Sequence, residues 1–244
     1  MSDWPADWIR PEWPAPARVR ACVTTRGGGM SPAPFDSFNL GDHVGDAADA
    51  VAANRLNLRR VLGCEPAWMS QVHSNIAVEA DPRGCPTADA SWTGAPGIAC
   101  AVLTADCLPV LFCDLVGTRV AAAHAGWRGL AAGILEATVA SMSTPGTQLI
   151  AWLGPAIGPE AFEVGAEVRE AFVSQHAVTA EAFSLSRNAG RYMADIYQLA
   201  RIRLAACGVT AVFGGGFCTV NDPRFYSYRR SARTGRFASL IWLD

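Results

Sequence analysis

The sequence predicts a single α/β domain built from mixed β-sheets, and three observations lead to this fold class. The chain has 244 residues, half of them hydrophobic, which is enough for one large core. The segments 98–104 and 108–113 are almost wholly apolar, as expected for strands that are buried on both faces. Amphipathic segments such as 191–206 have helical spacing and alternate with the strands. No low-complexity linker or internal repeat divides the chain, so we expect one domain over residues 19–244.

The first half of the chain starts with an arm over residues 1–18. Its prolines at 5, 11, 14 and 16 fix φ and lack a donor, so we expect an extended segment anchored by Trp4, Trp8 and Trp13. Residues 19–25 alternate like a strand, and 49–62 have helical spacing that ends at Gly63. Short strands are expected near 67–72 and 75–79, followed by a Pro- and Gly-rich loop over 81–97.

The second half alternates strands and helices. After the apolar strands at 98–104 and 108–113, the pattern predicts strands at 118–123 and 148–153, with a helix at 127–142 between them. Helices are expected near 160–174 and 191–206, and final strands at 209–213, 216–220, 225–229 and 237–242. Periodicity does not reveal the order of these strands in the sheets.

Composition excludes several classes of protein. The net charge is −2 and the basic residues are scattered, which argues against a nucleic-acid partner. The apolar runs are too short to cross a membrane, and the N-terminus does not resemble a secretory signal. Eight cysteines without such a signal indicate reduced thiols, so we expect a cytoplasmic protein, and a monomer because no coiled-coil pattern occurs. All 20 basic residues are Arg, which excludes Schiff-base chemistry on lysine.

Three residues with metal-ligand chemistry stand at the ends of apolar runs: His73, Cys107 and His124. Strand ends can converge on one point, where two imidazoles and a thiolate hold zinc and leave a fourth position open. The same set can supply a Cys nucleophile with a His base. Their spacing matches no short zinc-finger pattern, and packing in the core is the alternative for each residue.

The loop over residues 24–45 is rich in glycine and carries a dense polar set. Two roles remain open for Arg26 and Asn39: contact with a ligand, or hydrogen bonds to the backbone of the loop itself. For Asp42 we favour the second role. His43 lies in the same segment and is a candidate for proton transfer or for a fourth metal ligand.

The chain resembles a known family through six stretches that follow one another in order from about residue 19 to 243. These are Thr-Thr-Arg-Gly-Gly-Gly through Asn-Leu-Gly-Asp-His-Val-Gly-Asp in 24–46, Gln-Val-His at 71–73, Thr-Ala-Asp-Cys-Leu-Pro at 104–109, His-Ala-Gly-Trp-Arg-Gly at 124–129, Leu-Gly-Pro-Ala-Ile-Gly-Pro at 153–159, and Phe-Tyr-Ser-Tyr-Arg-Arg through Thr-Gly-Arg in 225–236. The family is the bacterial laccase-domain family, variously called multicopper polyphenol oxidase-like, purine nucleoside phosphorylase and peptidoglycan editing factor.

The resemblance implies a fold and a metal site. The fold is a single layered domain of mixed sheets flanked by helices, similar to that of cysteine hydrolases. By motif, the zinc ligands of the family fall on His73, Cys107 and His124. One departure is Ser74, where the family usually has Gly after Gln-Val-His. A hydroxyl at this position changes the surroundings of a ligand but should not remove the metal.

The function implied by the resemblance is purine nucleoside chemistry: phosphorolysis of adenosine, inosine, guanosine and methylthioadenosine, together with deamination of adenosine. An open zinc site suits deamination, because the metal activates a water molecule. We expect Asp106 and His43 to transfer protons, although Asp106 can instead orient a ligand. Arg26 and one of Arg229 and Arg230 are expected to hold phosphate, and an ion pair that locks the final strands is the alternative for the last two.

Three other functions are weighed against this one. A Cys107 nucleophile would make the chain an amidase that removes wrongly incorporated amino acids from cytoplasmic peptidoglycan precursors. Copper oxidation of phenols is disfavoured because four histidines cannot build a type 1 site and a trinuclear cluster, so copper in this site would be adventitious. A structural zinc completed by His43 would make the protein a binding scaffold.

Overall fold

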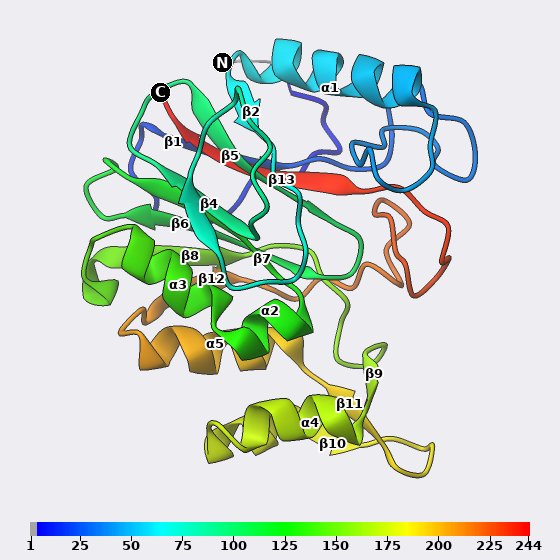
Figure 1. The fold of residues 1–244 in the computed structure, drawn as a ribbon, viewed down its shortest axis with the longest axis vertical. Helices are drawn as coiled ribbons and strands as arrows, with labels where there is room; N and C mark the ends of the chain where they lie inside the picture. The colour runs from blue at the N-terminus through cyan, green and yellow to red at the C-terminus, as the bar shows by residue number, and fades with distance from the viewer. Residues whose placement is uncertain (1–3) are drawn as a thin grey trace.

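The protein is a stack of four layers, in which two β-sheets face each other and helices cover both outer surfaces (Figure 1). The computed structural model describes residues 4–244, so residues 1–3 of the predicted arm lie outside the described part. No helix in the described part has both the length and the hydropathy that a membrane crossing requires. The fold confirms the predicted class of mixed sheets flanked by helices.

The first sheet has four strands in the order β1-β13-β5-β2. Its strands are β1 (Val19–Val23), β13 (Phe237–Leu243), β5 (Ile98–Thr104) and β2 (Glu65–Ala67), and only the β2–β5 pair is parallel. Helix α1 (Ala48–Leu62) covers the outer face and ends at Gly63 in the left-handed conformation, as the sequence predicts. Along β5, Ala99, Ala101 and Leu103 pack toward this helix.

The second sheet has six strands in the order β12-β8-β6-β7-β4-β3. They are β12 (Ala211–Gly214), β8 (Leu149–Leu153), β6 (Leu108–Asp114), β7 (Val120–Ala125), β4 (Ala90–Thr93) and β3 (Ala77–Glu79). The pairs β12–β8 and β4–β3 are parallel, whereas the central pairs are antiparallel. Three helices cover its outer face: α2 (Trp127–Ala132), α3 (Ile134–Ser141) and α5 (Ile196–Ala206).

Strand β6 shows why the central strands are apolar along their whole length. Val110 and Phe112 pack toward the helices, whereas Leu111 and Cys113 pack against the first sheet. Alternate side chains of a strand point to opposite faces, so a strand with a layer on each side buries all of them. The uninterrupted apolar run is therefore the direct consequence of the two-sheet stack.

A small lobe extends from the helical side of the stack (Figure 1). It consists of a three-stranded antiparallel sheet, with β11 (Arg191–Ala194) between β10 (Phe183–Leu185) and β9 (Glu163–Gly165), and of helix α4 (Ala166–Val173). A short 3-10 helix over Ala177–Ala182 follows α4, and another, over Gly146–Gln148, precedes β8.

Several predicted boundaries are wrong for identifiable reasons. The helix expected over 127–142 is broken at Gly133, whose φ of 95° ends α2 before α3 begins. The helices expected over 160–174 and 191–206 begin as strands β9 and β11, because these segments pair with each other. The loop expected over 81–97 contains β4, which pairs with β7.

Two further strands are absent where the sequence predicts them. The segments 216–220 and 225–229 are turns and irregular chain, although Phe225 and Tyr226 are fully buried. The strand prediction at 225–229 was wrong because these two aromatic residues are buried in a loop and not in a sheet. In the arm, Ile9 forms an isolated bridge with Val23, and Trp8 is buried beside Phe38, so this segment packs onto the first sheet.

Candidate functional site

The three predicted metal ligands come from the region where the chain crosses from one sheet to the other. Strand β5 belongs to the first sheet and β6 to the second, and Cys107 lies on the short link between them. His124 is in β7, where it pairs with Pro109 at the adjacent end of β6. His73 lies in the loop before β3 with a φ of 62°, a conformation that few non-glycine residues adopt.

The ligand atoms of His73, Cys107 and His124 all lie within 4.8 Å of one another. Cys107 Sγ is 3.7 Å from His73 Nε2, and the two imidazole centroids are 4.7 Å apart with their planes at 68°. His124 is buried, Cys107 is half-buried and His73 is exposed. The cluster therefore runs from the core to the solvent, so that one side of it remains accessible.

Two glycines at the start of α2 make room for this cluster. A Cβ on Gly126 would lie 2.7 Å from His73 Cδ2 and 2.9 Å from Cys107 Sγ. A Cβ on Gly129 would lie 2.9 Å from the carbonyl oxygen of Ser74. Because real Cβ atoms do not approach other atoms so closely, the His-Ala-Gly-Trp-Arg-Gly motif is in part a packing requirement of the site.

Asp89 connects the two histidines. Its fully buried carboxylate accepts hydrogen bonds at Oδ1 from His73 N (2.9 Å) and pairs there with His124 Nδ1 (2.8 Å). At Oδ2 it accepts bonds from Val72 N (3.2 Å), Ser74 N (2.6 Å) and Ser74 Oγ (2.7 Å). Burial opposes ionisation, but the hydrogen bonds from His124 and Ser74 outweigh it and hold the pKa of Asp89 well below its ordinary value.

This arrangement sets the tautomer of His124. With Nδ1–H donated to Asp89, Nε2 is directed away from the carboxylate. Its lone pair can bind a metal, and when Nε2 is protonated its N–H can donate to Cys107. Ser74 takes part in the same network, since its hydroxyl donates to Asp89. Ser74 therefore acts on the carboxylate that supports His124.

The charges of Cys107 and His124 are coupled. Burial disfavours the thiolate, but the positive charge of His124 and hydrogen bonds from His124 and His73 lower the pKa of Cys107 to about 6. Burial likewise disfavours the imidazolium, but Cys107 and Asp89 raise the pKa of His124 to about 9. In the metal-free protein at neutral pH, the pair is therefore a thiolate beside an imidazolium.

These donors fit a soft or borderline divalent metal. Two imidazoles and a thiolate suit zinc or copper, whereas calcium and magnesium prefer oxygen. The ligand group over residues 4–244 comprises these three side chains and no fourth. A three-ligand protein set is typical of catalytic zinc sites, whereas structural sites are usually closed by four.

The cluster opens into a cavity of about 500 Å³. One part of its lining is apolar and aromatic: Leu103, Trp127, Ile157, Phe162, Ile196 and Tyr228. The other part is polar: His43, Gln71, Asp106, Arg128, Arg229 and Arg236. A cavity of this size, with an apolar wall and a few convergent polar groups, is typical of a small-molecule site.

Comparison with known proteins shows the family to which the chain belongs. The family model described as multi-copper polyphenol oxidoreductase laccase matches residues 20–244. The chain belongs to this family. A solved Neisseria meningitidis structure, described as a DUF152 protein, is similar with a TM-score of 0.95 and 50% identity, covering 98% of this chain and 99% of that one. YlmD from Geobacillus stearothermophilus is similar with a TM-score of 0.90 and 29% identity, covering 98% and 97%.

Curated relatives in the family bear another kind of name. A Pseudomonas aeruginosa protein named purine nucleoside phosphorylase is 68% identical, over 97% of this chain and 98% of its own length. The Escherichia coli K12 protein named purine nucleoside phosphorylase YfiH is 53% identical, over 96% and 98%. Family membership thus confirms the predicted resemblance over nearly the whole chain.

The two predicted proton-transfer residues both line the cavity but differ in their surroundings. Asp106, at a φ of 91°, accepts hydrogen bonds from Thr219 Oγ1 and from Arg229 N, both at 2.6 Å. Both of its oxygens are therefore engaged in holding the C-terminal loops. His43 has a largely exposed side chain, with Nδ1 3.5 Å from Asp42 Oδ1. Of the two, His43 is free to approach a ligand.

The predicted substrate-binding residues are dispersed. Arg26 donates to the carbonyl and the carboxylate of Asp36 and is not among the residues that line the cavity. Asn39 is buried and bonds to the backbone of Gly41 and to Arg236 N.

The two C-terminal arginines differ as well. Arg229 lines the cavity, and its guanidinium donates to the carbonyls of Ala161 and Glu163. Arg230 lies outside the lining and donates to the carbonyls of Thr219, Val220 and Phe225.

Sequence reasoning missed Asp89 and two of the arginines in the cavity, Arg128 and Arg236. Both arginines occur in motifs that carry the family resemblance: Arg128 follows Trp127 in the His-Ala-Gly-Trp-Arg-Gly motif, and Arg236 follows Gly235 in Thr-Gly-Arg. Their place in these motifs was the signal that could have identified them as cavity residues. Asp89 had no comparable signal, because it lies in a loop-like Thr-Ala-Asp-Ala segment far from the histidines in sequence.

Proposed function

We propose that this protein is a zinc-dependent purine nucleoside enzyme that cleaves adenosine, inosine, guanosine and methylthioadenosine with phosphate and also deaminates adenosine. The names of the curated relatives support the reaction class. The single structural observation that carries the proposal is the convergence of two imidazoles and a thiolate on one side of a cavity of about 500 Å³.

The cavity suits a flat heterocycle attached to a sugar. Ile157, Phe162 and Ile196 provide an apolar wall, and Tyr228, which is 57% exposed, stands at the edge of the same cavity. Burial of a purine against such a wall is favourable, and an aromatic edge offers stacking to the ring. The polar residues on the other side then face the ribose and the attacking group.

The site residues have separate roles in this proposal. His73, Cys107 and His124 would hold the metal, which when bound supplies a Lewis acid and lowers the pKa of a water molecule that it coordinates. Asp89 fixes the orientation of His124. Asp106 positions the C-terminal loops around the cavity, and His43 is the group with the exposure needed to exchange protons with a ligand.

Product analysis tests this function. Purified metal-loaded protein is incubated with adenosine, with and without phosphate, and adenine and inosine are separated by chromatography. We expect adenine only with phosphate and some inosine in both cases, and we expect Cys107→Ala to lose both products. Cys85→Ala is the matched control, because Cys85 is exposed and does not line the cavity. Absence of both products from the wild-type protein would reject the function.

Amide hydrolysis is the second candidate, and one observation favours it. The lowered pKa of Cys107 beside His124 is what a cysteine nucleophile requires. A thiolate that is bound to a metal is not free to attack, so the two functions respond oppositely to metal removal. Release of an amino acid from a peptidoglycan precursor by chelator-treated protein, with loss in Cys107→Ser, would favour the amidase.

Copper oxidation of phenols is the third candidate and the weakest. The chain has four histidines, and two of them lie in the cluster, which is too few for a multicopper centre. Oxygen uptake with a phenol and the copper-loaded protein measures this activity directly.

A cytoplasmic location and a monomeric state belong to the proposal as well. Sedimentation of the purified protein tests the monomeric state.

A further inference from the structure

Arg236 is a half-buried cation that lines the cavity of the candidate site. Among the ion pairs of residues 4–244, no carboxylate lies within salt-bridge distance of its guanidinium. Nη1 donates to the carbonyl oxygens of Thr234 (3.1 Å) and Gly235 (3.0 Å), whereas Nε and Nη2 have no hydrogen-bond partner in the described chain. Because this residue lines the cavity of the candidate site, the two unused donors are available to a ligand there.

The chain holds Arg236 in place from both sides. Its backbone N–H donates to Asn39 Oδ1 (2.8 Å), and its carbonyl accepts from Leu40 N (3.0 Å). The side chain passes over Gly41, where a Cβ would lie 2.8 Å from Arg236 Cγ. The Asn-Leu-Gly motif therefore serves as a support for this arginine, which explains why Asn39 does not itself reach the cavity.

Electrostatics favour an anion beside this guanidinium. Burial lowers the pKa of Arg236, and Cys107, Asp106 and Tyr228 only partly oppose this effect. Both carboxylate oxygens of Asp106 are already engaged with Thr219 and Arg229. A half-buried charge that lacks a fixed counterion gains from a mobile one, and a guanidinium offers a paired set of donors to a tetrahedral oxyanion.

The other candidate cations in this region are already occupied or lie at the rim. Arg26 is paired with Asp36, and Arg229 donates to two backbone carbonyls. Arg128 is exposed and lines the same cavity, with its guanidinium 4.4 Å from the centroid of its neighbour Trp127. Its charge therefore stands at the mouth of the cavity, where it can attract an anion.

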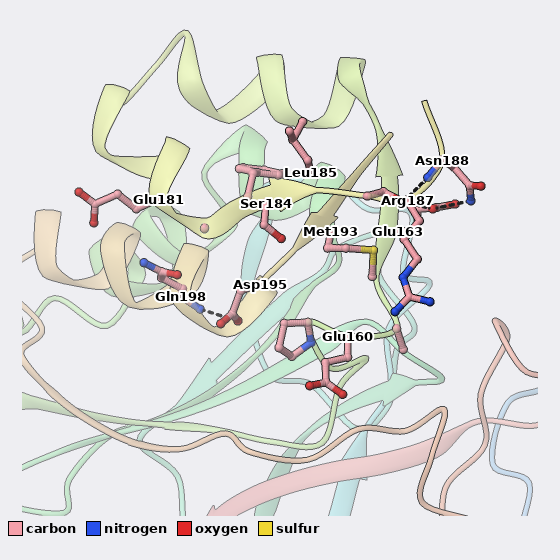
Figure 2. Close-up of a pocket in the computed structure, with 15 residues that line it drawn as sticks. Glu160, Glu163, Glu181, Ser184, Leu185, Arg187, Asn188, Met193, Asp195 and Gln198 are labelled. Atoms are coloured by element: carbon pink, nitrogen blue, oxygen red, sulfur yellow. Dashed lines mark hydrogen bonds between the residues drawn. The ribbon is translucent and has the colours of Figure 1, made fainter. Parts of the chain in front are cut away.

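A second, larger cavity does not compete for an anion. It has a volume of about 890 Å³ and lies between the small lobe and the start of α5 (Figure 2). Its lining carries four carboxylates and one arginine: Glu160, Glu163, Glu181, Asp195 and Arg187. Such a lining repels phosphate, whereas the cavity beside Cys107 is lined by Arg128, Arg229 and Arg236 and has the appropriate charge.

We propose that Arg236 is the phosphate-binding residue of this protein, with Arg128 attracting the anion at the mouth of the cavity. This inference rests on the proposed function, because it names the subsite for the attacking group in phosphorolysis. The sequence suggested Arg26 and one of Arg229 and Arg230 for this role. Arg26 and Arg230 do not line the cavity and Arg229 donates to two backbone carbonyls, whereas Arg236 lines the cavity and retains two unused donors.

Calorimetric titration of the metal-loaded protein with inorganic phosphate tests the inference without any nucleoside. We expect Arg236→Gln to raise the dissociation constant for phosphate by at least about tenfold, as expected for loss of a charge-assisted hydrogen bond. Gly41→Ala is a second variant, which leaves the guanidinium in the protein but displaces its stem, and should weaken binding as well. The matched control is Arg83→Gln, which removes an exposed arginine outside the cavity and should leave binding unchanged.

The outcomes separate this inference from the proposed function. Phosphate binding that depends on Arg236 supports the subsite even if no nucleoside is cleaved. If adenosine is cleaved with phosphate, Arg236→Gln should raise the KM for phosphate and leave the KM for the nucleoside near its wild-type value. Wild-type phosphate affinity in a folded Arg236→Gln protein overturns the inference, as does loss of binding in Arg26→Gln alone.

Discussion

Replacement of Asp89 by Asn should weaken both the metal site and the fold, because this carboxylate accepts five hydrogen bonds with two oxygens. An amide of the same size has one acceptor oxygen and a donor group in place of the other. If the amide NH2 replaces Oδ2, it faces the N–H groups of Val72 and Ser74, and both lose their acceptor. If it replaces Oδ1, it donates to His124 Nδ1 and moves the imidazole proton to Nε2, which can then no longer bind a metal.

The second orientation is the less costly one, since it leaves the backbone N–H of His73 as the one unpaired amide. An unpaired buried donor costs about 1–3 kcal/mol, so we expect the free energy of unfolding to fall by about that amount. Loss of a supporting carboxylate typically lowers metal affinity by about 10–100-fold. The tautomer change predicts that the affinity loss will be at the upper end of this range.

Two measurements check this prediction. Urea unfolding monitored by tryptophan fluorescence gives the stability, and competition with a chromophoric chelator gives the zinc affinity. Asp81→Asn is the matched control: Asp81 pairs with Arg83 on the surface, and its replacement should leave the stability close to the wild-type value. Zinc affinity and stability equal to those of the wild type in Asp89→Asn would refute the role of Asp89 as the support of His124.

Three further predictions follow from the packing and charges. Gly126→Ala should lower metal affinity while α2 remains intact, because the new Cβ would lie within 3 Å of His73 and Cys107; an unchanged chelator titration would contradict this. In metal-free protein, the rate of alkylation of Cys107 by iodoacetamide should increase with pH around a midpoint of about 6, because the thiolate predominates above its lowered pKa. The variant His124→Gln should move this midpoint to higher pH. A midpoint near pH 9 in the wild type would be inconsistent with the coupling of the two charges. Phe112→Ala should cost about 3–5 kcal/mol in urea unfolding because Phe112 is fully buried between β6 and the helices.

The elements that the sequence predicted correctly are those whose pattern depends on near neighbours. Helix α1 has apolar residues at helical spacing and a glycine where it ends, and both signals are local. The buried strands β5 and β6 are uninterrupted apolar runs within the predicted bounds, apart from one residue at the end of β6. The errors arose where a distant partner decided the conformation, as in β4, which became a strand by pairing with β7.

The chemistry of the site was visible in the sequence because residue type alone restricts it. Histidine is rare in this chain, and two of its four histidines stand with Cys107 at the ends of apolar runs. His73, Cys107 and His124 could therefore be selected before their proximity was known. What holds these residues was not visible. Asp89 is 35 residues from His124, and Arg236 is 197 residues from Asn39, and no pattern of neighbouring residues encodes such contacts.

The sequence by itself therefore determined the fold class, the family and the three candidate ligand residues, since these follow from periodicity, motifs and side-chain chemistry. Only the tertiary structure decided that Arg26 and Arg230 lie outside the cavity while Arg236 lies inside it. The physical reason is that every arginine carries the same charge, and its role depends on which acceptors the folded chain places around it. For Arg26 these are the oxygens of Asp36, whereas Arg236 retains two donors that the described chain leaves unused.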